Sequence, residues 1–462
     1  MKGFTRRGFL AAGAMAALSS AAGSVAAGGG SIGTNKQSLP WRNWSGSVVG
    51  YPEARLVPDS EAQLAEFLAN SSGLLRPVGS GHSFSPLVPT DGHIVVLDKL
   101  TGLLSNDSER LRATFAAGTR LVDMGAPLKQ IGQSMFTLPD IDRQTLAGAC
   151  ATATHGTGID FKSLSGYITS LRLITPQGEQ LDIDAQSNPE LFRAAVVSLG
   201  ALGVITRIEM QNRAPYRLKQ RSWVEKTDSI LAQFDELTDR HRHFEILPLT
   251  HSDYSLVLAT DETDEPINNP PASPEEEAAF GAAMRGWMTL PPEQRRPHIN
   301  ALAQFIEPSE RVDDSYKILS SVRSNRFNEM EYSLPKDAGA ACLQEILATI
   351  ADQKLDVVFP LEYRYVAKDD SMLSMSSGHE DHVAVSVHRI ASEDYRPYFD
   401  VIEPIFWKYG GRPHWGKIHT LGAAQLTELY PDFARFQQIR QDIDPRGRML
   451  NAHLRKLFVG ES

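Results

Sequence analysis

Several residue types and patterns are scarce in this 462-residue chain. It has only two cysteines, Cys150 and Cys342, which excludes a disulfide-stapled scaffold; the sequence does not say whether they pair. No run of 18 or more apolar residues follows the first 27 residues, so we expect no integral membrane span in the mature chain. Acidic residues outnumber basic ones, 56 to 46, which argues against nucleic acid as a partner.

Complete nucleotide and metal motifs are missing too. In "GSGHSF", Gly79 and Gly81 lack the third glycine of a dinucleotide fingerprint, and Phe84 stands in its place. No phosphate-loop lysine motif occurs, so a plain Rossmann domain is disfavoured. The histidines of "HRHFE" (241–245) and "HEDH" (379–382) make no full zinc ligand set, and we interpret them as surface polar residues. We expect no metal.

The N-terminus carries an export signal. Residues 1–27 hold the pair Arg6 and Arg7, then an Ala-rich apolar stretch and small residues, the order typical of a twin-arginine signal peptide. Its removal would delete three basic residues and shift the net charge from −10 to −13. We expect an exported protein, periplasmic or extracellular.

The remaining chain indicates an α+β protein of two domains. Short β-rich runs alternate with helical patterns up to Asn212, among them a helix that begins near Ser60, a distorted helix from Thr119 and a strand pair in 165–183. The pattern changes near Arg213, so we expect domains at 41–214 and 215–462. An acidic, proline-rich stretch at 261–277 is interpreted as an exposed insertion.

Four stretches could carry chemistry. "RPVGSGHSFS" (76–85) places a histidine in a glycine turn that could bind an anion through backbone N–H groups, or could be an ordinary polar turn. "TLAGACATATHGTG" (145–158) permits close approach of a ligand, or tight packing. "FPLEYRY" (359–365) puts Glu362 and Arg364 on one strand face, and "RPHWGKIHT" (412–420) gathers ring and cationic side chains.

Together these stretches resemble the FAD-linked oxidases of the vanillyl-alcohol oxidase superfamily, in the branch of sugar-lactone and alditol oxidases. The resemblance runs from "NWSG" at Asn43 through "GSGHSF", "THGTG", "SLGALGVIT", "LEYRY" and "HWGK" to the terminal "NAHLRKLF". It implies a two-domain FAD-binding fold of the PCMH type with an α+β substrate-binding cap domain. A C-terminal segment of that cap would contact the flavin.

The resemblance also implies which residues contact the cofactor. His82 matches the histidine that is joined covalently to the flavin in this family. The other matching positions are Pro77, Val78, Gly79, Ser80, Gly81, Ser83, Thr145, Gly148, Thr152, Ala153, Thr154, His155 and Ile205.

On the substrate side, the resemblance implies a catalytic set of Glu362, Arg364, Lys417 and His388. Glu362 and Arg364 match a substrate-facing acid and arginine, and Lys417 a cation beside the flavin that stabilises its reduced form or assists in taking a hydroxyl proton. Pro139 matches a position that gates oxygen and favours oxidase behaviour, and Asp140 a substrate contact. The segment around them is shorter than in the alditol oxidases.

The implied reaction is oxidation of an alcohol group on a small polyhydroxy compound, most simply D-arabinono- or L-gulono-1,4-lactone. Hydride would pass to flavin N5, and O2 would reoxidise the flavin and give H2O2. The alternatives are an alditol oxidase of the xylitol or sorbitol type, a dehydrogenase that uses another electron acceptor, and a non-catalytic flavin or sugar carrier. Retention of Glu362, Arg364 and Lys417 argues against the carrier. The sequence does not indicate an oligomeric state.

Overall fold

The computed structural model describes residues 39–270, 282–283, 285–321 and 325–460, and the export signal lies outside them. Within the described residues, no helix is long and apolar enough to cross a membrane. Both cysteines are free and buried. Mixed sheets and helices make up the fold, as the α+β pattern predicts.

The first part of the chain contains two small sheets and a strand pair. β1 (Trp41–Arg42) pairs with β2 (Val49–Gly50), and a parallel sheet has the order β3 (Ala54–Leu56), β5 (His93–Val96), β4 (Leu75–Val78). An antiparallel sheet follows in the order β6 (Leu103–Asp107), β7 (Arg112–Ala116), β10 (Val204–Gln211), β8 (Ile168–Ile174), β9 (Gln180–Asp184). The helices in this first part of the chain are α2 (Glu61–Asn70), η1 (Leu121–Asp123), α3 (Gly125–Gln130), α4 (Leu146–Ala151), η2 (Leu164–Tyr167) and α5 (Pro189–Ala195).

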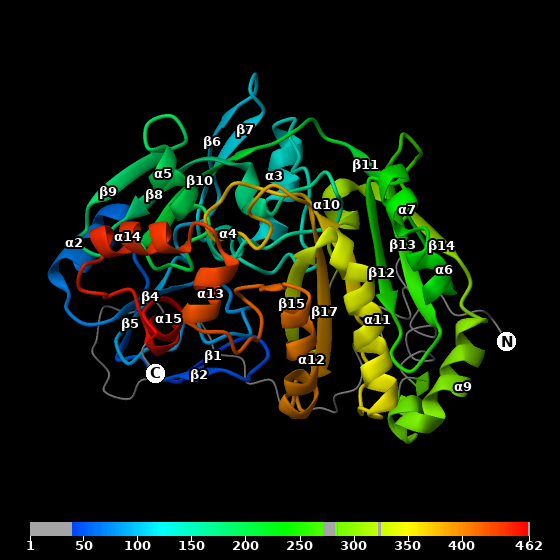
Figure 1. Cartoon of the computed structure of the whole chain (residues 1–462). Helices are drawn as coiled ribbons and strands as arrows, with labels where there is room; N and C mark the ends of the chain where they lie inside the picture. The colour runs from blue at the N-terminus through cyan, green and yellow to red at the C-terminus, as the bar shows by residue number, and fades with distance from the viewer. Residues whose placement is uncertain (1–38, 271–281, 284, 322–324, 461–462) are drawn as a thin grey trace.

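The second part is built on one large antiparallel sheet. Its order is β14 (Ser309–Asp314), β11 (Arg217–Lys226), β13 (Tyr254–Glu262), β12 (His243–Pro248), β16 (Glu362–Val366), β17 (His382–Ile390), β15 (Phe327–Pro335), β18 (Arg412–Pro413). The accompanying helices are α6 (Thr227–Leu231), α7 (Phe234–Arg240), α9 (Pro292–Ala303), α10 (Ser315–Ile318), α11 (Lys336–Asp352) and α12 (Arg396–Lys408). The long helices α11 and α12 pack against β15 and β17 and cover one face of the sheet (Figure 1).

The last helices return to the first part of the chain. α13 (Ala423–Leu429), α14 (Phe433–Ile443) and α15 (Ala452–Phe458) are drawn in red beside the blue and cyan elements in Figure 1, and α14 packs against α5. One hydrophobic core joins all three segments, with Leu173, Phe244 and Leu454 among its fully buried members. The distal residues of the chain therefore stabilise elements that are formed by its beginning.

Local signals predicted several elements correctly. Ser60 caps α2 by accepting a hydrogen bond from the backbone N–H of Gln63 at 3.2 Å, and the predicted strand pair forms β8 and β9, which are joined by a turn where Gly178 has φ +85°. The helix expected from Thr119 is split into η1 and α3. Pro127 lies in the first turn of α3, where a missing N–H group costs no helical hydrogen bond.

Two surface assignments were wrong. His243 and His382 are 4% and 2% exposed, because β12 and β17 turn these positions toward the interior. The acidic stretch at 261–277 is described only in part. Residues 263–270 are mostly exposed, although Asn268 exchanges two backbone hydrogen bonds with Val312, and residues 271–277 lie outside the described residues.

Candidate active site

A large cleft is lined both by the two glycine-rich segments and by strands of the large sheet. Its empty space is about 2060 Å³, including open solvent at the mouth. The same cleft reaches from the glycine-rich segments to β16 and β17 of the large sheet, so a ligand bound in it can contact both walls at once.

Nearly all of the residues proposed from the sequence line this cleft. On the cofactor side they are Pro77, Val78, Gly79, Ser80, Gly81, His82, Ser83, Thr145, Gly148, Thr152, Thr154, His155 and Ile205; on the substrate side they are Pro139, Asp140, Glu362, Arg364, His388 and Lys417. Ala153 is not among the lining residues. It is fully buried with φ +53°.

The "GSGHSF" loop leaves β4 and presents His82 to the cleft. Gly81 has φ +70°, a conformation that favours glycine, and the Asn43 side chain donates to the carbonyl of Ser83 at 3.0 Å. The His82 ring stacks on Trp44, with 5.3 Å between ring centroids. Burial, followed by the positive charges of Lys417 and nearby arginines, lowers the pKa of His82 to about 4. The imidazole is therefore neutral at neutral pH, with a free lone pair.

Two glycines of this wall leave no room for a side chain. A Cβ added to Gly79 would lie 2.1 Å from Thr145 Oγ1, and one added to Gly148 would lie 2.9 Å from the same atom. Nearby, the buried hydroxyl of Ser80 has no hydrogen-bond partner. A bare backbone and an unsatisfied hydroxyl fit a ligand with polar oxygens that lies flat against this wall.

A buried arginine fixes the strand that leads into the loop. The Arg76 guanidinium is 1% exposed and donates to four main-chain carbonyls, including Leu87 at 2.8 Å and Met449 at 2.5 Å. The Asn451 amide donates to the carbonyls of Pro86 and Pro89 at 3.0 and 2.8 Å. The C-terminal segment thus holds both ends of the histidine loop.

On the substrate side, β16 places Glu362 and Arg364 on one face, while Tyr363 is 1% exposed on the other. Arg364 Nη2 lies 3.4 Å from Glu362 Oε2 and 3.3 Å from Glu331 Oε2. Burial alone would lower the pKa of Arg364, but Glu362, Glu331 and Glu245 raise it above its ordinary value. The guanidinium is a permanent cation that is already neutralised by its acids.

Lys417 is held at the cleft by an acid on another strand. Its ammonium forms an ion pair with Glu329 Oε2, and Glu329 Oε1 lies 3.6 Å from His388 Nε2. Burial would raise the pKa of Glu329, but Lys417 and His388 lower it to about 2. Burial would likewise lower the pKa of His388, but Glu329 raises it. His388 also contacts the Pro360 carbonyl through Nδ1 at 3.1 Å.

Sequence reasoning missed the acids that organise these cations. Glu329 and Glu331 alternate with Met330 and Tyr332 on β15, so both carboxylates share one face of the strand. The alternation of acidic and apolar residues in "NEMEY" (328–332) could have predicted that both carboxylates lie on one strand face. Glu245 was missed as well: it faces Arg364 in the β12–β16 register, and burial raises its pKa.

The proposed gate segment is tied to the large-sheet part of the chain. Pro139 and Asp140 line the cleft. The Ser320 hydroxyl donates to the Pro139 carbonyl at 2.8 Å, and the Ser321 hydroxyl donates to Asp140 Oδ1 at 2.6 Å. These contacts fix the segment at the cleft.

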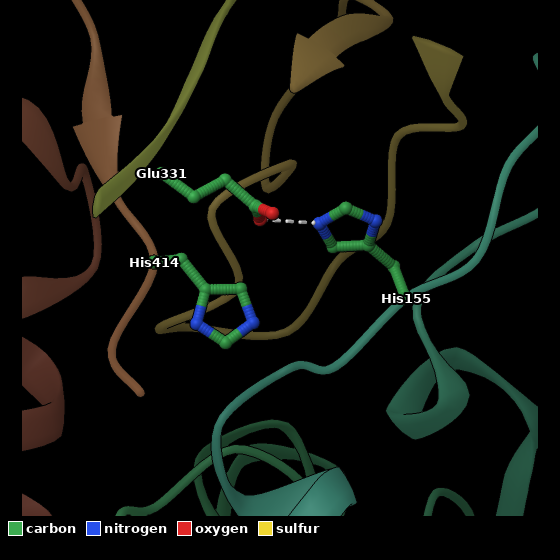
Figure 2. A group of neighbouring side chains, drawn as sticks. All are labelled: His155, Glu331 and His414. Carbon is green, nitrogen blue, oxygen red and sulfur yellow. Dashed lines mark hydrogen bonds and ion pairs between the residues drawn. The ribbon is translucent and has the colours of Figure 1, made fainter. Parts of the chain in front are cut away.

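One cluster in the cleft has the composition of a metal site but not its chemistry. Figure 2 shows His155, Glu331 and His414, whose candidate ligand atoms lie within 4.8 Å of one another. His414 Nδ1 accepts a hydrogen bond from the Gly416 amide at 3.0 Å, so in the neutral ring the proton is on Nε2. Burial also lowers the pKa of His414 to about 3. With one nitrogen bonded and the other protonated, His414 is a poor metal ligand.

Solved structures share the fold. A variant of cholesterol oxidase from Brevibacterium sterolicum matches with a TM-score of 0.74 at 14% identity, covering 91% of this chain and 96% of that chain. A family model described as an FAD binding domain matches residues 52–184. These residues include the "GSGHSF" loop and both sides of its glycine cradle, which fit a flat, polar cofactor. The class is therefore that of FAD-dependent oxidoreductases with the vanillyl-alcohol oxidase fold.

The second half of the chain defines the family. The model of the D-arabinono-1,4-lactone oxidase family matches residues 208–457, more than half of the chain, and this protein belongs to that family. An L-gulono-1,4-lactone dehydrogenase from Mycobacterium tuberculosis is 36% identical over 90% of this chain and 99% of its own length. An L-gulonolactone oxidase from Bos taurus is 28% identical over 91% and 99%, and a Streptomyces alditol oxidase 27% over 90% and 99%.

Proposed function

We propose that this enzyme oxidises a hydroxyl-bearing carbon of an aldono-1,4-lactone such as L-gulono- or D-arabinono-1,4-lactone. The proposal rests on one cleft with two different walls. One wall is the glycine cradle, which fits FAD, and the other carries Glu362, Arg364 and Lys417, which fit a neutral polyhydroxy compound. Bound FAD would supply the hydride acceptor. The residues of this chain orient the substrate and manage its charges.

Glu362 and Arg364 are proposed to bind the substrate. Arg364 can donate to a ring or carbonyl oxygen, and Glu362 can accept from a hydroxyl. Because acids already surround Arg364, a substrate carboxylate would meet net negative charge there. The site therefore favours the closed, neutral lactone over the open-chain acid.

Lys417 and His388 are proposed to handle charge and the proton. The Lys417 ammonium faces the cleft, and its ion pair with Glu329 holds it in that position. His388 stands beside the same acid and contributes a polar contact from β17. We expect Lys417→Ala to retain flavin and lose most of its turnover, whereas unchanged turnover would remove the assigned role of Lys417.

We further propose that His82 is joined covalently to the flavin. Its neutral, cleft-facing imidazole is the support. The purified protein is precipitated with acid, and the flavin absorbance of the pellet is measured. We expect the pellet of the parent protein to stay yellow and that of His82→Ala to lose its colour; release of all flavin by the parent would remove this role for His82.

For the electron acceptor we propose molecular oxygen. Pro139 matches the position that gates oxygen in the related oxidases, and it lines the cleft. The relative that is named a dehydrogenase favours a second candidate, an enzyme that passes electrons to another acceptor. Lactone oxidation is assayed once for peroxide in air and once with an artificial dye under nitrogen. Peroxide in proportion to lactone consumed supports the oxidase; turnover with the dye alone supports the dehydrogenase.

The substrate class and the destination of the protein are tested separately. Steady-state kinetics on aldonolactones, their hydrolysed acids and alditols should give the highest kcat/KM with a lactone; preference for xylitol or sorbitol would instead support an alditol oxidase.

We also propose export by the twin-arginine route, supported by Arg6 and Arg7. Replacing both arginines with lysine should leave the protein in the cytoplasmic fraction, and unchanged fractionation would contradict export by this route.

A further inference from the structure

A single buried acid joins the two walls of the cleft. Glu331 is 2% exposed and projects from β15 of the large sheet. Its Oε1 lies 2.9 Å from Nε2 of His155 in the second glycine-rich segment, as drawn in Figure 2. Its Oε2 lies 3.3 Å from Arg364 on β16. One carboxylate thus contacts a residue of the cofactor wall and a residue of the substrate wall.

The hydrogen bonds of His155 fix its charge. His155 Nδ1 lies 3.0 Å from the carbonyl of Gly156, which can only accept, so Nδ1 carries a proton. Nε2 faces the Glu331 carboxylate. Burial alone would raise the pKa of Glu331, but His155 and Lys417 hold it well below its ordinary value, so this carboxylate is ionised and also accepts. Both ring nitrogens of His155 therefore face acceptors, an arrangement that an imidazolium satisfies by donating from each nitrogen.

The position of His155 gives this charge a role. His155 is 4% exposed overall, yet it lines the cleft next to Thr154 of the cofactor wall. A buried cation needs a hydrogen-bonded counter-ion, because removing a charge from water is costly. Among the described residues, Glu331 is the acid that lies within hydrogen-bonding distance of His155.

We propose that Glu331 is a positioning residue that keeps His155 as a cation on the cofactor wall while it holds Arg364 on the substrate wall. This inference rests on the proposed function only in that the cleft binds flavin. His155 then adds a second positive charge, beside that of Lys417, to the surroundings of the cofactor. The effect of Glu331 on the cofactor passes through His155, and its effect on substrate passes through Arg364.

The first test measures charge at the cofactor without any substrate. Sulfite adds to oxidised flavin and leaves a negative charge on it, so its affinity reports the positive charge nearby. We expect Glu331→Gln, which keeps the size of the side chain, to raise the Kd for sulfite by up to about tenfold, because the positive charge on the cofactor wall is lost while the lost carboxylate lies on the other wall. We expect the flavin reduction potential to fall in the same variant.

The control is a second buried acid of equal exposure. Glu403 is 2% exposed and accepts hydrogen bonds from Tyr332 at 2.6 Å and the Thr420 hydroxyl at 2.8 Å, outside the cleft lining. We expect Glu403→Gln to lower thermal stability and leave sulfite affinity unchanged. Unchanged or tighter sulfite binding in Glu331→Gln would overturn the proposal, because the imidazolium would then not depend on Glu331.

A double variant separates the two effects of Glu331. We expect His155→Gln, which removes the cation and leaves the Glu331 anion, to weaken sulfite binding at least as much as Glu331→Gln, and the double variant to bind sulfite as Glu331→Gln does. Additive losses would overturn the route through His155. We also expect Glu331→Gln, but not His155→Gln, to raise KM for lactone several-fold, because only the former removes one of the two acids that pair with Arg364. Sulfite binding needs no lactone, so a wrong substrate assignment would leave the cofactor result intact.

Discussion

The glycine at position 79 illustrates how one residue can decide cofactor binding. Its missing side chain leaves room for Thr145 Oγ1, which also caps α4 by accepting a hydrogen bond from the Gly148 amide at 3.3 Å. The cradle and the helix cap therefore share a single hydroxyl. A side chain at residue 79 would displace that hydroxyl and disturb both features.

We expect Gly79→Ala to destabilise the protein by about 1–3 kcal/mol, the usual cost of overpacking, and to reduce its flavin content. Thermal unfolding and flavin absorbance per protein measure the two effects. Gly286→Ala is the control, because a Cβ there meets nothing within 4 Å. Equal flavin content in Gly79→Ala and the parent would show that the cradle does not contact the cofactor.

Single residues also mark where sequence reasoning reached its limit. The glycine and histidine motifs are contiguous, so "GSGHSF" and "THGTG" could be assigned to one site before the fold was known. Glu331 could not, because its partners His155 and Arg364 are 176 and 33 residues away. An acid that alternates with apolar residues on a strand is usually solvated, and only the packing of β15 against the cofactor segment buries this one.

At the scale of elements, the helix α15 both ends the fold and supports the site. The Asn451 side chain caps α15 through the Leu454 amide at 2.9 Å, while its amide group donates to the carbonyls of Pro86 and Pro89. The cap is a local feature that sequence patterns recognise. The two donations across the fold are not, since they depend on how α15 docks against the loop after His82.

Two substitutions separate these functions of Asn451. We expect Asn451→Ser to keep the cap, lose the part-buried hydrogen bonds to the carbonyls of Pro86 and Pro89 and cost about 0.5–1.5 kcal/mol, with weaker flavin binding. Asn451→Ala should cost about 1 kcal/mol more, because it also removes the cap. Urea unfolding gives both values. Equal stability of the Ser variant and the parent would show that the donations to the loop contribute nothing.

Across the whole molecule, buried neutral histidines link folding to pH. Burial lowers the pKa of His243, His382 and His453 to about 4, and that of His414 and His419 to about 3. The unfolded chain takes up protons as the pH falls below about 6.5, whereas the folded chain does so only near these lower values. The free energy of unfolding is therefore highest above pH 6.5 and falls as the pH drops from 6.5 to 4.

We expect His382→Gln to flatten this pH dependence, because it removes one proton from the difference between the two states. Its cost in stability should be smaller at pH 5 than at pH 7.5, as measured by urea unfolding. His379→Gln is the matched control, since His379 lies three residues away in the same motif and is exposed. A cost for His382→Gln that does not change with pH would contradict a neutral buried imidazole.

The contacts of Arg76 bear on the order of events in the cell. Residue 449, one of its four carbonyl partners, lies 373 positions further along the chain. A ribosome releases the N-terminal glycine loop long before it makes the segment that holds this loop in place. We therefore expect flavin loading to follow completion of the polypeptide, because a product that stops short of Met449 would carry the cofactor motifs without this support. Bound flavin would thus indicate that the whole chain has been synthesised and folded.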